Sequence, residues 1–423
     1  MRYLTPLLPA AILTGSVLAA ALSLSSLAWS QDATVPQALV NALWQASSDE
    51  ESARVKQEIL DTGANAYRMY LSLRRGPEYE APGEEGGAVF SREAEGEEFP
   101  YYVSIPADYN PGQSYPVEFA LHGGVGRPKP AAGENFWERT ISRLNAEDRF
   151  MVIPLSWQEA YWWADSQADN LTAILKELKG RFNIDENRVF LSGVSDGGTG
   201  AYFFAFKQPS EWAAFLPYIG HPGVLRNPNS GGGYRLYFEN LANKPLYIVN
   251  GENDRLYPAA SLASFMEILK QAEVDYTWRV IEDGGHNTEW MPDEREAIEA
   301  FKAANPRDPF PDEIQWVADR TDRYNRNQWI VVEELAEEDL PSLLRVQRDG
   351  NSFSVDARGV SRFTLLLNPE EINFADPVLV SINGRIVHSD TVRESVETLL
   401  DWAARDRDRT MLFTAELSFD VEE

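Results

Sequence analysis

No cysteine occurs among the 423 residues of this chain, which limits how the protein can be anchored or cross-linked. The chain cannot be a lipoprotein attached through an N-terminal cysteine, and its fold uses no disulfide. Apolar residues make up 43% of the sequence, an ordinary share for a globular protein. The fold must therefore be stabilised by the packing of its core.

Basic residues are also scarce. The chain has 38 lysines and arginines against 66 aspartates and glutamates, which gives a formal net charge of −28. A surface of this sign repels nucleic acids and anionic membranes and keeps the protein soluble, so we expect neither as a partner. Because the acidic residues are dispersed, a solvated surface suited to salty or extracellular conditions is a simpler explanation than recognition of a cationic substrate.

The first 30 residues have the pattern of a signal peptide. Arg2 supplies a positive start, residues 7–27 are largely apolar, and Ala28-Trp29-Ser30 has the small-x-small form of a cleavage site. An uncleaved membrane anchor is the competing interpretation, since about 20 apolar residues can span a bilayer. Pro6 and Pro9 favour cleavage, so we expect export to the periplasm or the medium, with membrane contact only through this segment.

A strand, a sharp turn and a helix are predicted around Ser195. The apolar run 189–191 ends at Gly193-Val194-Ser195-Asp196-Gly197, and small and aromatic residues of helical character follow. A Gly-x-Ser-x-Gly turn at this place is a nucleophile elbow, in which the flanking glycines avoid collision with neighbouring backbone. A serine hydroxyl reacts only when a base removes its proton, so Ser195 requires a base, a carboxylate and donors for an oxyanion.

Only four histidines are present, which makes the search for the base short. His286 lies in a glycine-containing loop between a predicted strand and a helix, where a base would approach the elbow. Asp254 follows an earlier strand and completes the chain order Ser, Asp, His. Glu252 and Asp283 are the rival carboxylates, and Asp283 is the weaker of the two because it is only three residues from the base.

Two sets of residues are expected around this serine. The backbone N–H of Asp196 is one predicted oxyanion donor, and the second should come from Gly124 or Val125, because glycine leaves the amides uncovered. A substrate pocket is the expectation for several aromatic and imidazole side chains near the elbow, with simple loop packing as the alternative for the tryptophans. Those pocket residues are His122, Trp157, Trp162, Trp163, His221 and Trp290.

The order of predicted elements divides the chain into four parts. After the signal peptide 1–30, residues 31–98 are expected to form a helical segment in two pieces and a linker rich in Gly, Pro and Glu. Strands and helices alternate over 99–305, which predicts an α/β unit with a mainly parallel sheet and helices on both faces. Residues 306–423 have mostly strand character, with one helix near 392–404, a long strand over 411–421 and a hairpin at Asn383-Gly384. They predict a smaller β-rich accessory domain.

Residues 99–304 resemble the α/β-hydrolase family, specifically its secreted esterases, feruloyl-esterase and polyhydroxybutyrate-depolymerase-like proteins, carboxylesterase/phospholipase-type enzymes and prolyl-oligopeptidase-like catalytic domains. The matching segments are Tyr102-Val103-Ser104-Ile105-Pro106, Leu121-His122-Gly123-Gly124, the elbow, Gly251 with Asp254, and Gly285-His286. The resemblance implies hydrolysis of acyl bonds through an acyl-enzyme, with no cofactor and no metal. Asp196 departs from the family pattern, which usually has an uncharged residue there.

A secreted serine esterase acting on a small or polymer-linked ester is therefore the expected function. A serine peptidase of prolyl-oligopeptidase type is one alternative, although residues 31–98 are too short for the N-terminal propeller of such enzymes. A non-catalytic protein that binds glycans or cell surfaces on a hydrolase scaffold is another. In either case the C-terminal part is a candidate for contact with carbohydrate or a cell surface.

Overall fold

The computed structural model describes residues 35–81, 86–131, 136–137, 148–338 and 340–422. The predicted signal peptide lies outside these residues. Within them, no helix is long and apolar enough to cross a membrane.

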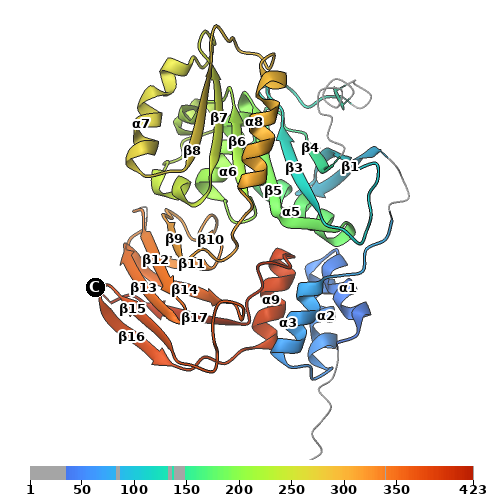
Figure 1. The fold of residues 1–423 in the computed structure, drawn as a ribbon, viewed down its shortest axis with the longest axis vertical. Coiled ribbons are helices and arrows are strands. Elements are labelled where there is room, and N and C mark those ends of the chain that lie inside the picture. Colours follow the sequence, from blue (N-terminus) through green and yellow to red (C-terminus); the bar gives the residue numbers. More distant parts are fainter. Residues whose placement is uncertain (1–34, 82–85, 132–135, 138–147, 339, 423) are drawn as a thin grey trace, which may run out of the picture.

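An eight-stranded sheet forms the centre of the larger unit (Figure 1). Its strands lie in the order β1-β2-β4-β3-β5-β6-β7-β8, and all neighbours are parallel except the pairs that include β1 or β2. The strands are β1 (Gly87–Ala94), β2 (Glu97–Ser104), β3 (Tyr115–Leu121), β4 (Phe150–Pro154), β5 (Ile184–Val194), β6 (Ala214–Tyr218), β7 (Leu246–Gly251) and β8 (Tyr276–Ile281). The predicted mainly parallel sheet is confirmed.

Helices cover both faces of this sheet, so its central strands are buried on both sides. Along β5, Leu191 packs on one face, with α5 (Asp165–Arg181), α6 (Asp196–Lys207) and α7 (Ala263–Gln271). Its neighbour Phe190 packs on the other face, with α8 (Met291–Ala304), which crosses the near side of the sheet in Figure 1. Such two-sided burial produces continuous apolar runs rather than alternation. Short 3-10 turns complete the unit: η1 (Pro222–Arg226), η2 (Pro228–Ser230), η3 (Phe238–Asn243) and η4 (Ala259–Leu262).

The predicted linker before residue 99 is wrong over much of its length. β1 and β2 form an antiparallel hairpin there, paired from Gly87 with Ser104 to Ala94 with Glu97. The turn between them places both Glu95 and Gly96 at positive φ, which glycine accepts readily and glutamate rarely adopts. Most residues of β1 are partly exposed because it is an edge strand, so its sequence lacks the apolar signal by which strands are recognised.

The N-terminal segment forms three helices rather than two pieces: α1 (Gln37–Gln45), α2 (Asp49–Leu60) and α3 (Ala66–Arg75). Ser48 caps α2, since its hydroxyl accepts the Glu51 N–H at 3.2 Å. Apolar residues of all three helices pack against Leu399 and Leu400 of α9 (Val396–Asp406). The first and last parts of the chain therefore share one small core, which lies beside the sandwich in Figure 1.

The C-terminal part is a β-sandwich with α9 at one end. A four-stranded sheet has the order β10-β11-β14-β17 and a five-stranded sheet the order β16-β15-β13-β12-β9, and residues of both line one core. The hairpin at Asn383-Gly384 joins β15 to β16, with both residues at positive φ as predicted. The last strand begins at Ala415, so the expected strand over 411–421 is shorter at its start. The bounds are β9 (Glu313–Trp316), β10 (Arg326–Asn327), β11 (Ile330–Leu335), β12 (Leu343–Asp349), β13 (Ser352–Arg358), β14 (Val360–Leu367), β15 (Val378–Ile382), β16 (Arg385–Asp390) and β17 (Ala415–Asp420).

A buried group of charges connects these parts. The carboxylate of Asp408, just after α9, accepts hydrogen bonds from Lys179 of α5 and Arg307, which follows α8, each at 2.9 Å. The three side chains are at most 1% exposed. Burial acts to raise the pKa of Asp408, but the two adjacent cations outweigh it and hold that pKa far below its usual range.

Replacing Asp408 by asparagine should strongly destabilise the protein. The change leaves the Lys179 and Arg307 charges buried without a counter-ion, a situation that costs about 3–5 kcal/mol. Urea unfolding would measure the loss. Asp401→Asn is the matched control, because Asp401 forms an exposed pair with Lys56 and such pairs contribute about 0–1 kcal/mol. Equal, small effects of both substitutions would contradict a structural role for the buried group.

Candidate active site

Ser195 occupies a strained turn between β5 and α6. Its φ of 59° and ψ of −115° lie outside the regions that non-glycine residues favour, and its N–H donates to the Tyr218 carbonyl at 2.9 Å. The turn is so tight that a Cβ at Gly193 would lie 2.1 Å from the Gly197 carbonyl oxygen. A Cβ at Gly197 would lie 2.0 Å from the Leu121 carbonyl oxygen. Glycine is therefore required at both flanking positions.

The structure brings Ser195 together with the two partners expected from the sequence. The Ser195 Oγ lies 2.8 Å from Nε2 of His286, in the loop that follows β8. The other ring nitrogen, Nδ1, lies 2.7 Å from Oδ2 of Asp254, in the loop that follows β7. In this arrangement the carboxylate fixes the imidazole orientation and the imidazole can accept the serine proton.

Asp254 is held in its ionised form. It is 2% exposed, and its Oδ1 accepts the N–H groups of Leu256 at 2.8 Å and Tyr257 at 3.0 Å. Burial acts to raise its pKa, but the hydrogen bonds from Tyr257, His286 and Leu256 outweigh burial and lower it. The stabilisation that comes with this lowered pKa is present at neutral pH and is lost as the pH falls through the lowered value.

The two rival carboxylates do not hold the imidazole. Glu252 accepts the backbone N–H of Asp283 at 3.0 Å, and the Asp283 carboxylate accepts from the Asn253 side-chain amide at 3.2 Å. Both are exposed and brace the loops on which Asp254 and His286 lie.

Of the two alternatives for the second oxyanion donor, Gly124 and Val125, the structure disfavours Val125. The Val125 N–H donates to Oδ2 of Asp196 at 3.0 Å, so it is occupied by a carboxylate. The N–H groups of Asp196 and Gly124 have no acceptor among the described residues. Asp196 is the first residue of α6, where a backbone N–H has no partner within the helix. The loop 122–125 also contacts the nucleophile, because a Cβ at Gly123 would lie 2.9 Å from the Cβ of Ser195.

The strand order and the positions of the site residues together decide the fold family. The elbow serine follows β5, the carboxylate follows β7, the histidine follows β8, and the glycine loop follows β3. The chain has the α/β-hydrolase fold.

The known proteins to which this chain is similar have low sequence identity to it and match its structure only in part. No protein-family model matches the chain. A bifunctional acetylxylan esterase/xylanase from Neocallimastix patriciarum is 25% identical over 169 residues, which are 39% of this chain and only 23% of that protein. An esterase from Thermogutta terrifontis matches at 14% identity and a TM-score of 0.43, over 53% of this chain and 94% of its own. An S-formylglutathione hydrolase from Staphylococcus aureus matches at 21% identity and a TM-score of 0.40, over 53% of this chain and 99% of its own.

His122 has a structural role in this α/β-hydrolase fold. Its Nδ1 lies 2.9 Å from the Gly123 carbonyl oxygen, and its Nε2 accepts the Ser156 N–H at 3.1 Å. The ring packs edge-on against Phe136 and Trp162. Burial lowers the pKa of His122 to about 4, so the ring is neutral at neutral pH. The Nε2 atom connects this loop to the loop at Ser156, and Nδ1 lies against its own loop, so the expectation that His122 lines a substrate pocket is not supported.

The four tryptophans expected around a pocket are packed inside the loops instead. None is more than 5% exposed. Trp157 lies against Phe99, and Trp163 stacks on Tyr161. Trp162 packs against His122, and Trp290 packs against Tyr218. The expectation that these tryptophans line a substrate pocket is therefore corrected to its alternative, loop packing, in which burial of large aromatic rings stabilises the fold.

His221 is half-buried. It is connected to His286 through the ring of Tyr257, a residue that the sequence did not single out. The His221 ring lies 5.6 Å from the Tyr257 ring, which lies 5.8 Å from His286. Tyr257 also donates its N–H to Asp254. Its position three residues after the acid was the available signal, but an aromatic residue in a loop has no motif of its own.

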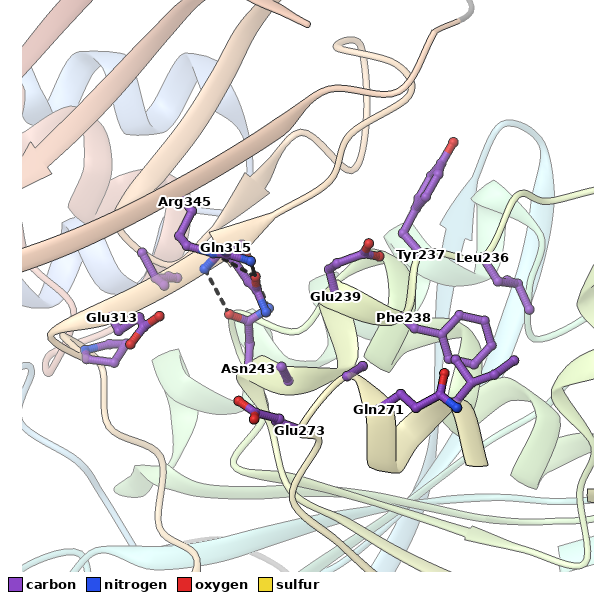
Figure 2. A pocket seen from close by; sticks show the side chains of 15 residues that line it. Leu236, Tyr237, Phe238, Glu239, Asn243, Gln271, Glu273, Glu313, Gln315 and Arg345 are labelled. Atoms are coloured by element: carbon purple, nitrogen blue, oxygen red, sulfur yellow. Dashed lines mark hydrogen bonds between the residues drawn. The ribbon is translucent and has the colours of Figure 1, made fainter. Parts of the chain in front are cut away.

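A groove of about 1080 Å³ lies elsewhere, between the two units (Figure 2). It is bordered by η3, by the end of α7 and by strands β9 and β12 of the sandwich. Since η3 and α7 lead into β7 and β8, it lies at the amino ends of these strands, opposite Ser195. Figure 2 shows Arg345 reaching Gln315. The amide oxygen of Gln315 accepts a hydrogen bond from the Arg345 guanidinium at 3.0 Å. The groove is therefore separate from Ser195, His286 and Asp254.

Asp254→Asn should nearly abolish the reactivity of Ser195. Asparagine can occupy the same space, but it stabilises neither the productive tautomer nor the imidazolium, a loss of about 10⁴-fold where such a carboxylate has been replaced. The rate of labelling by a fluorophosphonate would measure this directly. Asp293→Asn, at an exposed position in the first turn of α8, serves as the control and should label at the unchanged rate. Comparable labelling of both variants would show that Asp254 does not support His286.

Proposed function

We propose that this protein is a serine hydrolase that cleaves carboxylic esters through an acyl-enzyme. The observation that carries the proposal is the continuous hydrogen-bonded chain from Ser195 through His286 to Asp254. It lies at the carboxyl ends of parallel strands, where sites of open α/β sheets gather.

The first half of the reaction forms the acyl-enzyme. His286 Nε2 takes the proton of the Ser195 hydroxyl as Oγ attacks the acyl carbon, and Asp254 stabilises the resulting imidazolium. The N–H groups of Asp196 and Gly124 donate to the carbonyl oxygen as it becomes negative. Collapse of the tetrahedral intermediate breaks the ester bond, and His286 gives its proton to the departing alkoxide.

Hydrolysis of the acyl-enzyme repeats these steps with water. His286 removes a proton from the water as its oxygen attacks the acyl carbon, and the same two N–H groups stabilise the second tetrahedral intermediate. The acid then leaves as Ser195 recovers its proton from His286.

Esters are preferred to amides because an alcohol is a better leaving group than an amine. A peptidase of prolyl-oligopeptidase type would also need a domain that restricts access to the site, and described residues 37–75 form three helices that pack with α9 instead. The non-catalytic alternative would be favoured by a histidine turned away from the serine. A separation of 2.8 Å between Ser195 and His286 gives it no support.

The proposal includes export and a polymer-linked substrate as its less direct parts. Residues 1–30 have the pattern of a signal peptide, and the partially matching relative from Neocallimastix patriciarum is described as an acetylxylan esterase/xylanase. An acetyl group on a polysaccharide is a polymer-linked ester, so acetylated glycans belong among the substrates to test. The β-sandwich is the part proposed to contact such a polymer or a cell surface.

Protein lacking residues 1–30 should hydrolyse p-nitrophenyl esters, and Ser195→Ala should lose this activity to the level of the uncatalysed reaction. The test uses acyl chains of about two to eight carbons, a feruloyl ester and an acetylated xylan, with circular dichroism to confirm folding. The chain-length profile would then measure the size of the acyl site.

Peptide p-nitroanilides provide the contrasting substrates. Cleavage of these amides with greater kcat/KM than any ester would favour the peptidase. Inertness toward every substrate, together with no fluorophosphonate labelling of Ser195, would refute the hydrolase.

A further inference from the structure

The carboxylate beside the nucleophile is the feature of this site that hydrolysis itself does not explain. Asp196 directly follows Ser195, and a negative charge at this place opposes the negative charge that develops on the substrate oxygen. A neutral residue would avoid that repulsion. The presence of Asp196 therefore calls for a compensating function.

The geometry supplies one. Oδ2 of Asp196 accepts the Val125 N–H at 3.0 Å across the space between the elbow and the loop 122–125. Val125 is 1% exposed, so water cannot readily replace this acceptor. A buried N–H without an acceptor is costly, and the loop would move to find one if the carboxylate were removed.

The loop 122–125 is otherwise held at its two ends, at its beginning through His122 and at its far end by the Val125 side chain, which packs in the main core. His122 is fixed by Ser156 through its ring and by Trp162, whose indole N–H donates to the His122 carbonyl at 2.9 Å. Beyond it come two glycines, and Gly124 has a φ of 74°. Glycine pairs permit many backbone conformations, so the hydrogen bond at Val125 adds a restraint on the backbone to the packing of the Val125 side chain.

We propose that Asp196 is a positioning residue that holds the loop 122–125 so that the Gly124 N–H serves the oxyanion. The inference rests on the proposed hydrolase function and deepens it. In this arrangement one N–H, that of Val125, is used to set the loop, and its neighbour is left for the substrate. The role depends on the acceptor oxygen of Asp196 and not on its charge.

Two substitutions separate acceptor from charge. Asp196→Asn keeps a side-chain oxygen that can accept the Val125 N–H and removes the charge, whereas Asp196→Ala removes both. Loss of one oxyanion donor lowers kcat by about 10²–10³-fold, so displacement of the Gly124 donor in the alanine variant should lower kcat by about 10–100-fold. We expect KM to change little. The asparagine variant should retain kcat within about threefold of the parent value, a difference in barrier of about 0.7 kcal/mol, or should exceed the parent value.

Amide hydrogen exchange provides a readout that does not depend on turnover. Exchange in the peptide containing Val125 should accelerate in the alanine variant and remain as in the parent protein in the asparagine variant. Asp293→Ala is the matched control, because Asp293 is an exposed acidic residue in the first turn of another helix, α8. It should leave both kcat and the exchange of this peptide unchanged.

The outcomes distinguish the inference from the function on which it rests. Equal kcat in all variants, or an equal fall in the alanine and asparagine variants, overturns the positioning role, since the second result assigns the effect to charge. If the parent protein neither hydrolyses esters nor labels with a fluorophosphonate, the proposed function fails. Val125 exchange then decides alone, and unchanged exchange in the alanine variant overturns the restraint.

Discussion

The close approach of the elbow to the end of β3 is the constraint on which the site depends. Gly197 lies so near the Leu121 carbonyl that a Cβ would come within 2.0 Å of its oxygen. Leu121 is the last residue of β3, so the same contact places the following loop, 122–125, beside Ser195. Ser195 and the loop 122–125 are thus positioned by backbone packing between neighbouring strands, which is more rigid than any pairing of surface side chains could be. The strain at Ser195 persists because this packing determines its conformation.

The remaining two catalytic candidates reach the serine because parallel strands end at the same edge of a sheet. The loops after β7 and β8 carry Asp254 and His286 there, although 91 residues separate His286 from Ser195 in the chain. Backbone hydrogen bonds from Leu256 and Tyr257 fix the carboxylate, which in turn fixes the imidazole. Each member is therefore oriented by the one before it, which is what a preorganised proton transfer requires.

The sequence predicted those features that depend on spacing within one loop or strand. The elbow, the acid turn and the base loop each have local glycines and a fixed place after an apolar strand, and their association follows from the topology of a parallel sheet. Val125 was different, because whether an N–H faces a substrate or a carboxylate depends on contact across two loops. The prediction that the tryptophans line a pocket was wrong for a similar reason. An indole in a loop has the same sequence signal whether its faces are exposed or covered. The hairpin of β1 lacks an apolar pattern because it is an edge.

The absence of cysteine gives the buried charges at Asp408 their significance. Three segments far apart in sequence meet there: the end of α5 on one face of the sheet, the segment after α8 on the other, and the end of α9, which packs on the N-terminal helices. A disulfide could join only two of them. Apolar contacts alone tolerate sliding, whereas a carboxylate that accepts from an ammonium and a guanidinium has few satisfactory geometries. Because an incorrectly docked arrangement would leave buried charges unpaired, the group penalises wrong relative placements more than it stabilises the right one. In this chain, the buried ion group thus restricts how the three segments can dock against one another.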